Sequence, residues 1–246
     1  MLSVKKPIFN DFLLVVTNSE KILSSFVLVE LLRGDGRLPI VRPQSTEGFG
    51  VPQETGNPWT VLTSTTKYEN AWIEVVEHKV LTPKGNPGIY GVVRPRGVAT
   101  GVVPIDDQGR VTLVGQYRFP LEQYSWEIPE GGGDKSVDPQ KSAARELLEE
   151  TGQTARHWLP LMTLHLSNCI TDEVAHTFLA WGLEQGTPCP DDTEVLAVRR
   201  VPFAETVAMA MRGEITDSMA VASLFKVQLM ALDGSLPDEV ARLIRP

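Results

Sequence analysis

The chain has 246 residues, of which 42% are hydrophobic and 22% are charged, and its formal net charge is −8. This composition is that of a soluble globular protein long enough for one large core or a core with an accessory unit, which argues against disorder throughout the chain. The negative charge also argues against a general nucleic-acid binder, because such proteins usually carry clustered positive charge. A phosphate-bearing substrate would need local neutralisation, which divalent metal ions held by acidic residues can supply.

The cysteine content and the apolar runs bear on where the protein works. Cys169 and Cys189 are too few for a disulfide framework, and no cysteine–histidine cluster has the spacing of a zinc site. The apolar run over residues 9–16 contains Asp11 and is followed by no small-residue cleavage site, so we interpret it as a buried strand rather than a signal peptide. No stretch reaches the roughly 18 uninterrupted apolar residues of a membrane helix. We therefore predict a cytoplasmic protein with neither a membrane nor a nucleic-acid partner.

Residues 1–56 differ in character from the rest of the chain. Apolar runs at residues 12–16 and 26–32 are followed by a stretch rich in Gly, Pro and Ser over residues 34–57, which has no clear helical or strand period. We therefore interpret residues 1–56 as an amino-terminal extension and linker, and residues 57–246 as the main domain.

Seven later segments have the length and the β-branched content of strands. They are residues 72–80, 88–93, 98–105, 111–117, 158–165, 176–183 and 195–201. Between the third and fourth of these, Asp106-Asp107-Gln108-Gly109 supplies the chemistry of a hairpin turn. Helices are predicted over residues 139–151, 203–212 and 218–232. Strands in mixed order with few helices between them predict an α+β fold, in which helices cover a curved or mixed sheet.

The first predicted helix has clear start and stop signals. Asp138 can accept from free backbone N–H groups, Pro139 fits the first helical position, and Gly152 is a natural stop. Apolar and small residues recur three and four apart within it, so we expect one face to pack against the sheet. These residues are Ala144, Leu147, Leu148 and Thr151.

Three carboxylates, Glu146, Glu149 and Glu150, crowd one turn of this helix, and we expect them on the opposite face. Like charges at this spacing repel by a few tenths of a kcal/mol per pair in an isolated helix. Oxygen clusters of this kind are what Mg²⁺ or Mn²⁺ requires, and a bound cation would turn the repulsion into stabilisation. The alternative is a solvated acidic face without a ligand.

A glycine-rich segment leads into the helix and completes a recognisable pattern. Residues 126–133, Trp-Glu-Ile-Pro-Glu-Gly-Gly-Gly, suggest a strand ending in a loop whose glycines let the backbone approach a ligand or metal. Loop and helix resemble the signature of the Nudix hydrolases. The matching residues, in the correct register, are Gly131, Arg145, Glu146, Leu147, Glu149, Glu150 and Gly152. Val137 stands where the family has its first Glu and Gln153 where it has an aliphatic residue; Asp138 is a candidate substitute for the missing Glu.

The resemblance implies a Nudix-like α/β/α sandwich with a mixed curved sheet, and roles for individual residues. Glu146, Glu149 and Glu150 would be ligands to Mg²⁺, with Mn²⁺ as a substitute, and the backbone carbonyl of Glu130 would complete the coordination. Arg145 would orient these carboxylates; it could also form an intrahelical ion pair with Glu149, and the two roles are compatible. Gly131 and Gly132 would lie against the substrate.

Outside the signature, residues 65–235 are similar to the branch that hydrolyses ADP-ribose and nucleotide sugars. In that branch Arg118 would bind the diphosphate, the alternative being an exposed arginine at a strand end. Glu173 follows a polar break at residues 167–172 and would be a base or a metal-binding carboxylate, the alternative being a surface-loop residue. Members of the branch are often homodimers in which the segment ahead of the core, here residues 1–80, contributes to the interface.

The implied function is Mg²⁺-dependent hydrolysis of a nucleoside diphosphate linked to another moiety, such as ADP-ribose or a nucleotide sugar. Glu173 or Glu150 would accept a proton from the attacking water. A rival hypothesis is a non-catalytic Nudix-like sensor of a nucleotide metabolite, which Val137 favours. A third, a structural interaction module, predicts no metal binding.

Overall fold

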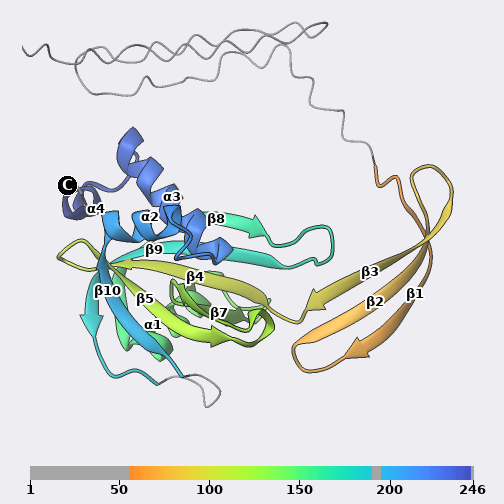
Figure 1. Cartoon of the computed structure of the whole chain (residues 1–246), viewed down its shortest axis with the longest axis horizontal. Coiled ribbons are helices and arrows are strands. Elements are labelled where there is room, and N and C mark those ends of the chain that lie inside the picture. Colours follow the sequence, from red (N-terminus) through yellow and green to blue (C-terminus); the bar gives the residue numbers. More distant parts are fainter. Residues whose placement is uncertain (1–55, 190–194, 245–246) are drawn as a thin grey trace, which may run out of the picture. The chain divides into compact units, whose positions relative to one another are not determined.

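A computed structural model of the chain describes residues 56–189 and 195–244 (Figure 1). Apart from its last residue, the extension expected over residues 1–56 lies outside this part. Within the described residues no single helix is long and apolar enough to cross a membrane. The last two helices pass that test of length and composition only when taken together, across a bend of 103°.

The first described element is a three-stranded antiparallel sheet in the order β1-β2-β3. Its strands are β1 (Thr60–Glu69), β2 (Ile73–Leu81) and β3 (Pro87–Pro95). The second and third match the strands predicted over residues 72–80 and 88–93. Strand β1 was not predicted, because all of its residues are exposed and it has no alternation between apolar and polar positions.

The larger sheet has seven strands and forms the centre of the main domain. They are β4 (Val98–Ile105), β5 (Arg110–Arg118), β6 (Gln123–Glu127), β7 (Glu130–Gly133), β8 (Gln153–His165), β9 (Val174–Gln185) and β10 (Ala197–Pro202). The order is β10-β5-β4-β9-β8, with β6 paired to β5 and β7 paired to β4. Strands β4 and β9 run parallel and the other neighbours antiparallel. The sheet is therefore mixed, as predicted.

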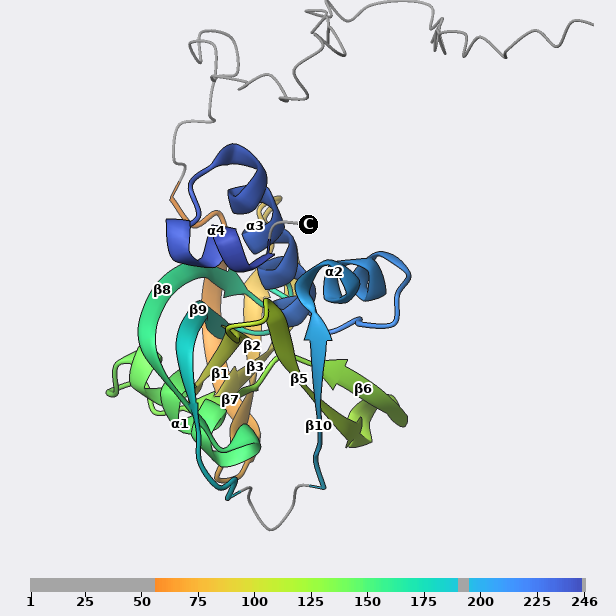
Figure 2. The same ribbon diagram turned by 90° about the vertical axis from the view of Figure 1, so that its left-hand side faces the viewer.

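Helices cover both faces of this sheet, so the predicted α/β/α sandwich is confirmed. They are α1 (Pro139–Thr151), α2 (Phe203–Met211), α3 (Ser218–Asp233) and α4 (Asp238–Ile244), with a 3-10 turn, η1, at Phe119–Leu121. Two views place α1 on the opposite side of the strands from the other three helices (Figures 1 and 2). Only the seven-residue α4 was not predicted among the helices.

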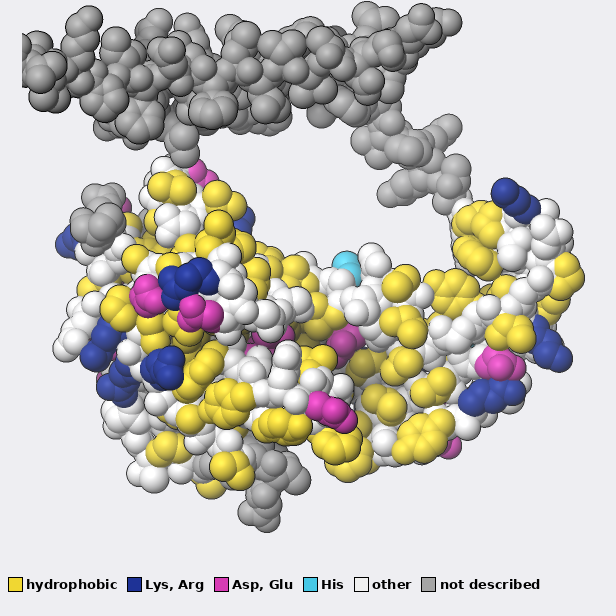
Figure 3. All heavy atoms as spheres, viewed as in Figure 1, with side chains coloured by type: hydrophobic (Ala, Val, Ile, Leu, Met, Phe, Trp, Pro, Cys, Tyr) yellow, Lys and Arg dark blue, Asp and Glu magenta, His cyan; other side chains and the backbone are white. Residues whose placement is uncertain are grey.

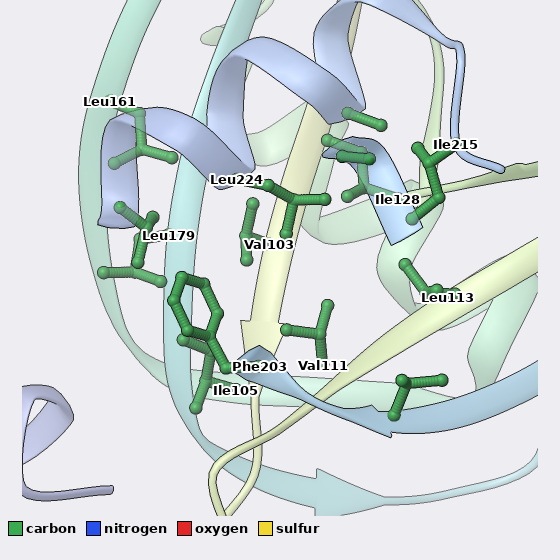
Figure 4. Close-up of a cluster of buried hydrophobic side chains, with 14 of the residues drawn as sticks. Val103, Ile105, Val111, Leu113, Ile128, Leu161, Leu179, Phe203, Ile215 and Leu224 are labelled. Carbon is green, nitrogen blue, oxygen red and sulfur yellow. The ribbon is translucent and has the colours of Figure 1, made fainter. Parts of the chain in front are cut away.

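The side chains of the central strands point alternately to the two faces of the sheet and divide the core into two clusters. On β4, Val102 packs with Ala143 and Leu147 of α1, whereas its neighbour Val103 belongs to the cluster beneath α2, α3 and α4. Figure 4 shows part of this second cluster, with Leu224 of α3 lying close to Val103. Because successive side chains of a strand point to opposite faces, one buried strand serves both layers and fixes the position of α1.

The hairpin between β4 and β5 is closed by Asp106, as the turn residues predicted. Its carboxylate accepts from the backbone N–H groups of Gln108 and Arg110, at 2.9 and 3.0 Å, and from the Arg110 side chain at 2.8 Å. Gly109 adopts the left-handed conformation at φ 71° that this turn requires. Burial opposes ionisation of Asp106, but the hydrogen bonds from Arg110 outweigh it and lower its pKa.

Replacing Asp106 with Ala is expected to lower the free energy of unfolding by about 2 kcal/mol, because two backbone donors and one charged donor lose their acceptor. Since the folded-state pKa is depressed, the stabilisation is present above the unfolded pKa and is lost as the pH falls through the folded one. Urea denaturation across acidic and neutral pH measures this difference. Asp107→Ala, at an exposed neighbour, is the control, and equal stabilities of the two variants at neutral pH would contradict the expectation.

Candidate active site

The glycine segment is a short strand, not the open loop predicted from the sequence. Strand β7 pairs with β4, and Gly131 lies opposite Thr100. A Cβ atom at Gly131 would overlap the carboxylate of Glu146. Glycine at this position therefore leaves the space in which the α1 carboxylate lies directly against the β7 backbone.

Helix α1 begins and ends as predicted, and Leu147 and Thr151 are buried as expected, but the rest of its buried face differs from the prediction. Asp138 accepts from Gln140 N at 3.0 Å, and Gly152 closes the helix at φ 70°. Leu148 is 41% exposed, whereas Glu146 and Glu150 are buried with Leu147. The face that contacts the sheet is thus rotated toward the carboxylates, because the side-chain-free backbone of β7 leaves room for them.

Arg145 holds two of the carboxylates together. Its Nη1 donates to Glu149 at 2.5 Å, and its Nη2 donates to Glu146 at 2.6 Å and to the carbonyl oxygen of Gly132 at 2.7 Å. The intrahelical pair with Glu149 is therefore present, together with a contact to β7. Burial alone would lower the pKa of Arg145, but Glu146 and Glu149 outweigh it and raise the pKa.

The third carboxylate, Glu150, is fixed from β7. Its Oε2 accepts from the backbone N–H of Glu130 at 3.1 Å. The three glutamates of the signature therefore lie at one junction between α1 and β7, although they do not all share the solvent face that the sequence suggested.

A cavity of about 680 Å³ lies in front of this junction. Five predicted site residues line it: Arg118, Glu130, Gly131, Gly132 and Glu173. None of the described residues that line it belongs to α1. Its other walls include Trp72 and the start of α3 at Asp217. A cavity of this size suits a ligand as large as a nucleotide derivative.

Arg118, the last residue of β5, is only partly exposed and is an ion-paired residue of the cavity wall. Its Nε donates to Glu127 at 3.0 Å, its Nη2 also donates to Glu127, and Nη2 lies 3.3 Å from Oε1 of Glu130. Burial works to lower the pKa of Arg118, but Glu127 and Glu130 more than compensate and raise it. The guanidinium therefore stays charged at the cavity.

The side chain of Glu130 is a feature that the sequence interpretation missed, since it assigned a role to the backbone carbonyl alone. The side chain is only 8% exposed, and its Oε2 has no hydrogen-bond partner among the described residues. Burial, followed by the nearby charges of Asp217 and Glu127, raises the pKa of Glu130 well above its usual range. Asp217 was also missed, because it follows β7 by more than eighty residues and reaches the cavity only as the N-cap of α3.

Glu173 lies at the end of the connection from β8 to β9 and faces the cavity, so it is not an ordinary surface-loop residue. Its backbone N–H donates to Thr171 Oγ1 at 3.1 Å, and its carbonyl accepts from Leu166 N at 3.2 Å. The same connection is held to β3 through the Val93 N–H, which donates to Ile170 O at 2.9 Å. Partial burial raises the pKa of the Glu173 carboxyl.

The two residues that depart from the signature, Val137 and Gln153, lie away from the cavity. Val137 is 41% exposed, and the carboxylate of Asp138 caps α1, so it does not take the place of the missing Glu. Gln153 is buried, and its side chain accepts from Thr151 Oγ1 at 3.4 Å. Neither residue lines the cavity within the described part of the chain.

The donors at the α1–β7 junction fit a divalent cation by their chemistry. They are carboxylate and backbone oxygens, the ligands that Mg²⁺ and Mn²⁺ prefer. Over residues 56–189 and 195–244, no group of three or more His, Cys, Asp or Glu side chains is arranged to hold a metal ion, and Arg145 bridges Glu146 and Glu149 instead. A cation at this junction therefore needs Arg145 to give up one of these contacts.

Comparison with known proteins agrees with this architecture. The family model of the NUDIX domain matches residues 95–220, and that of the nucleoside diphosphate sugar hydrolase N-terminal domain matches residues 59–93. The chain belongs to the Nudix family. It is thus a Nudix hydrolase, an enzyme that acts on phosphoanhydride bonds, and enzymes of this family generally need a divalent metal.

The relatives of this Nudix hydrolase carry related names. An ADP-ribose pyrophosphatase of Mycobacterium tuberculosis is 32% identical over 179 residues, which cover 72% of this chain and 86% of that protein. An ADP-ribose pyrophosphatase of Bacillus subtilis is 30% identical over 159 residues, covering 64% and 85%. The crystal structure of an ADP compounds hydrolase superposes with a TM-score of 0.65 at 23% identity, covering 74% of this chain and 98% of that one. This last likeness concerns the fold alone.

Proposed function

We propose that this Nudix hydrolase is a Mg²⁺-dependent pyrophosphohydrolase that cleaves the diphosphate of a nucleoside diphosphate linked to another moiety, with ADP-ribose as the first candidate and nucleotide sugars as the wider class. The observation that carries the proposal is the junction of three α1 carboxylates with the β7 glycines beside a cavity that also holds Arg118 and Glu173. The names of the relatives support the choice of ADP-ribose.

The metal would be Mg²⁺, with Mn²⁺ as a substitute, held by Glu146, Glu149, Glu150 and the backbone carbonyl of Glu130. When bound, such an ion neutralises charge on a transferred phosphoryl group and lowers the pKa of a water molecule. Arg145 contacts both Glu146 and Glu149 and, on giving up one of these contacts to the ion, would position the carboxylate that it keeps. The glycines of β7 allow the backbone to approach the diphosphate without steric hindrance.

Glu173 is the preferred base for the attacking water. It faces the cavity, and a carboxylate with a raised pKa is a stronger proton acceptor near neutral pH. Glu150 is the second candidate, but it is buried and its Oε2 already accepts from Glu130 N. Arg118 contacts Glu127 and Glu130 through Nε and Nη2 and would offer Nη1 to the diphosphate.

Trp72 offers a stacking surface for the base of the substrate, since the residue is 75% exposed and lines the cavity. Replacing Trp72 with Ala is expected to raise KM about tenfold with little change in kcat, because stacking on an aromatic ring contributes about 1–3 kcal/mol. Steady-state kinetics with ADP-ribose measures the effect, and Trp72→Phe, which keeps a ring, should restore most of it. An unchanged KM in the alanine variant would remove Trp72 from the substrate site.

We also propose that the protein acts in the cytoplasm as a homodimer, with residues 1–80 contributing to the interface. Hydrophobic side chains gather over the three-stranded sheet in the space-filling view (Figure 3). Those most exposed on or beside its strands are Val61, Leu62, Tyr68, Trp72 and Ile89. Exposed apolar area of this kind is typical of a protein interface. Sedimentation equilibrium measures the mass of the assembly against that of one chain.

The proposal is tested by turnover of a panel of nucleoside diphosphate derivatives in Mg²⁺, with a chelator as the control. We expect ADP-ribose or a nucleotide sugar to yield a nucleoside monophosphate and a second phosphorylated product, and the chelator to stop the reaction. The rival sensor is not favoured, because Glu146, Glu149 and Glu150 of the signature are present and an acidic residue, Glu173, lines the cavity. Tight binding of a panel member without turnover in any divalent metal would reverse this preference.

A further inference from the structure

The cavity wall is strongly acidic for an enzyme proposed to bind an anionic substrate. Four carboxylates line it, those of Glu127, Glu130, Glu173 and Asp217, and Arg118 is the cation among the described lining residues. Arg118 is moreover committed to Glu127 and Glu130. The part of the wall away from Glu173 is therefore suited to a neutral, hydrogen-bonding group and not to a further phosphate.

Glu130 is the residue of this wall that has a carboxyl oxygen left for a ligand. Its Oε1 lies 3.3 Å from Arg118 Nη2, whereas its buried Oε2 has no partner among the described residues. Leaving a buried carboxyl oxygen without a partner is unfavourable, so a site of this kind usually accepts a hydrogen bond from something that binds there. Glu130 is among the residues that line the cavity.

Asp217 stands beside Glu130 and interacts with it electrostatically and through their carboxyl groups. It is held in place as the N-cap of α3, where Oδ1 accepts from Ala220 N at 2.7 Å. The pair thus joins β7 to the start of α3 and presents two fixed carboxyl groups to one region of the cavity. Sugar hydroxyls are donors of the right kind for such a pair.

We propose that Glu130 and Asp217 bind hydroxyl groups of the terminal sugar of the substrate and reject substrates that carry a phosphate on that sugar. The inference rests on the proposed function and identifies a specificity-determining residue within it. A hydroxyl group satisfies Oε2 of Glu130, whereas a phosphate would be placed against the acidic pair of Glu130 and Asp217, whose nearest cation, Arg118, is already paired. Specificity of this kind comes from repulsion of the wrong ligand as much as from attraction of the right one.

The test compares ADP-ribose with its derivative phosphorylated on the terminal ribose. The ratio of the two kcat/KM values is measured for the wild type, Glu130→Ala and Glu130→Gln. Both variants keep the backbone carbonyl, and the second also keeps a hydrogen-bonding side chain. We expect the wild type to disfavour the phosphorylated compound and Glu130→Ala to relax this preference about tenfold with a higher KM for ADP-ribose, whereas Glu130→Gln, which keeps a hydrogen-bonding group of the same size, should stay close to the wild type. Glu184→Gln, at an exposed carboxylate outside the cavity, is the matched control.

Binding measured by calorimetry in a chelator gives the same ratio as dissociation constants, without any turnover. Failure of the wild type to hydrolyse either compound would therefore count against the proposed function, while the binding ratio alone decides the inference about Glu130. An unchanged ratio in Glu130→Ala would overturn it. The inference would also be overturned if Glu130→Ala changed only the preference against a derivative phosphorylated on the adenosine ribose. Glu130 would then face the adenosine half of the substrate.

Discussion

Replacing Glu149 and Glu150 together with Gln is expected to abolish hydrolysis, with kcat reduced at least about a thousandfold. Both side chains lie at the junction of α1 with β7, and both are proposed to hold the divalent cation that neutralises the reacting phosphoryl group. Glutamine keeps the size of each side chain but removes its charge, so the cation loses two anionic ligands. Initial rates in saturating Mg²⁺, with ADP-ribose or whichever panel member reacts, measure the loss.

Two controls make this result specific. Glu184→Gln removes an exposed carboxylate that pairs only weakly with Arg156, at 3.8 Å, and should retain full activity. Thermal unfolding should show that the double variant is folded, which matters because Glu150 accepts a hydrogen bond from the β7 backbone. Full activity of a folded double variant would disprove the assignment of the α1 carboxylates.

Replacing Glu173 with Gln is expected to lower kcat by about 10²–10⁴, the usual contribution of a general base. Burial raises the pKa of Glu173, and the base must be ionised to accept a proton. The rate of the wild type should therefore rise with pH through this raised pKa and then level off. In the glutamine variant this rise of the rate with pH, the acidic limb of the pH–rate profile, should disappear together with the activity.

A pH–rate profile of both proteins measures these two effects at once. Asp172→Asn is the matched control, since Asp172 is the exposed neighbour that pairs with Arg94 and does not line the cavity. If Glu173→Gln kept both the rate and the acidic limb of the wild type, the proton would have to go elsewhere. Glu150 would then be the remaining candidate.

Features with strong local signals could be predicted from the sequence. Helix α1 begins and ends at the predicted residues, because Asp138, Pro139 and Gly152 act within one turn of the helix end. Five strands of the large sheet, β4, β5, β8, β9 and β10, were predicted where β-branched residues cluster, whereas β6 and β7 lack such residues and were not. The order of the signature residues also placed the three carboxylates beside a glycine segment, and the structure brings them together there.

Features that depend on distant parts of the chain could not be predicted. Periodicity assigned Leu148 to the buried face because leucine is apolar, yet the bare backbone of β7 favours Glu146 and Glu150 at that contact. The acidic wall could not be foreseen, since Asp217 joins Glu130 only when the fold brings the N-cap of α3 to the cavity. Strand β1 lacked a signal because none of its residues is buried.

The most direct measurement is the anomalous difference density of a crystal soaked in Mn²⁺. The proposed site predicts a peak among the carboxylate oxygens of Glu146, Glu149 and Glu150, with Arg145 displaced from at least one of them. Density that leaves these oxygens without an ion at saturating Mn²⁺, with Arg145 still bridging Glu146 and Glu149, would contradict it.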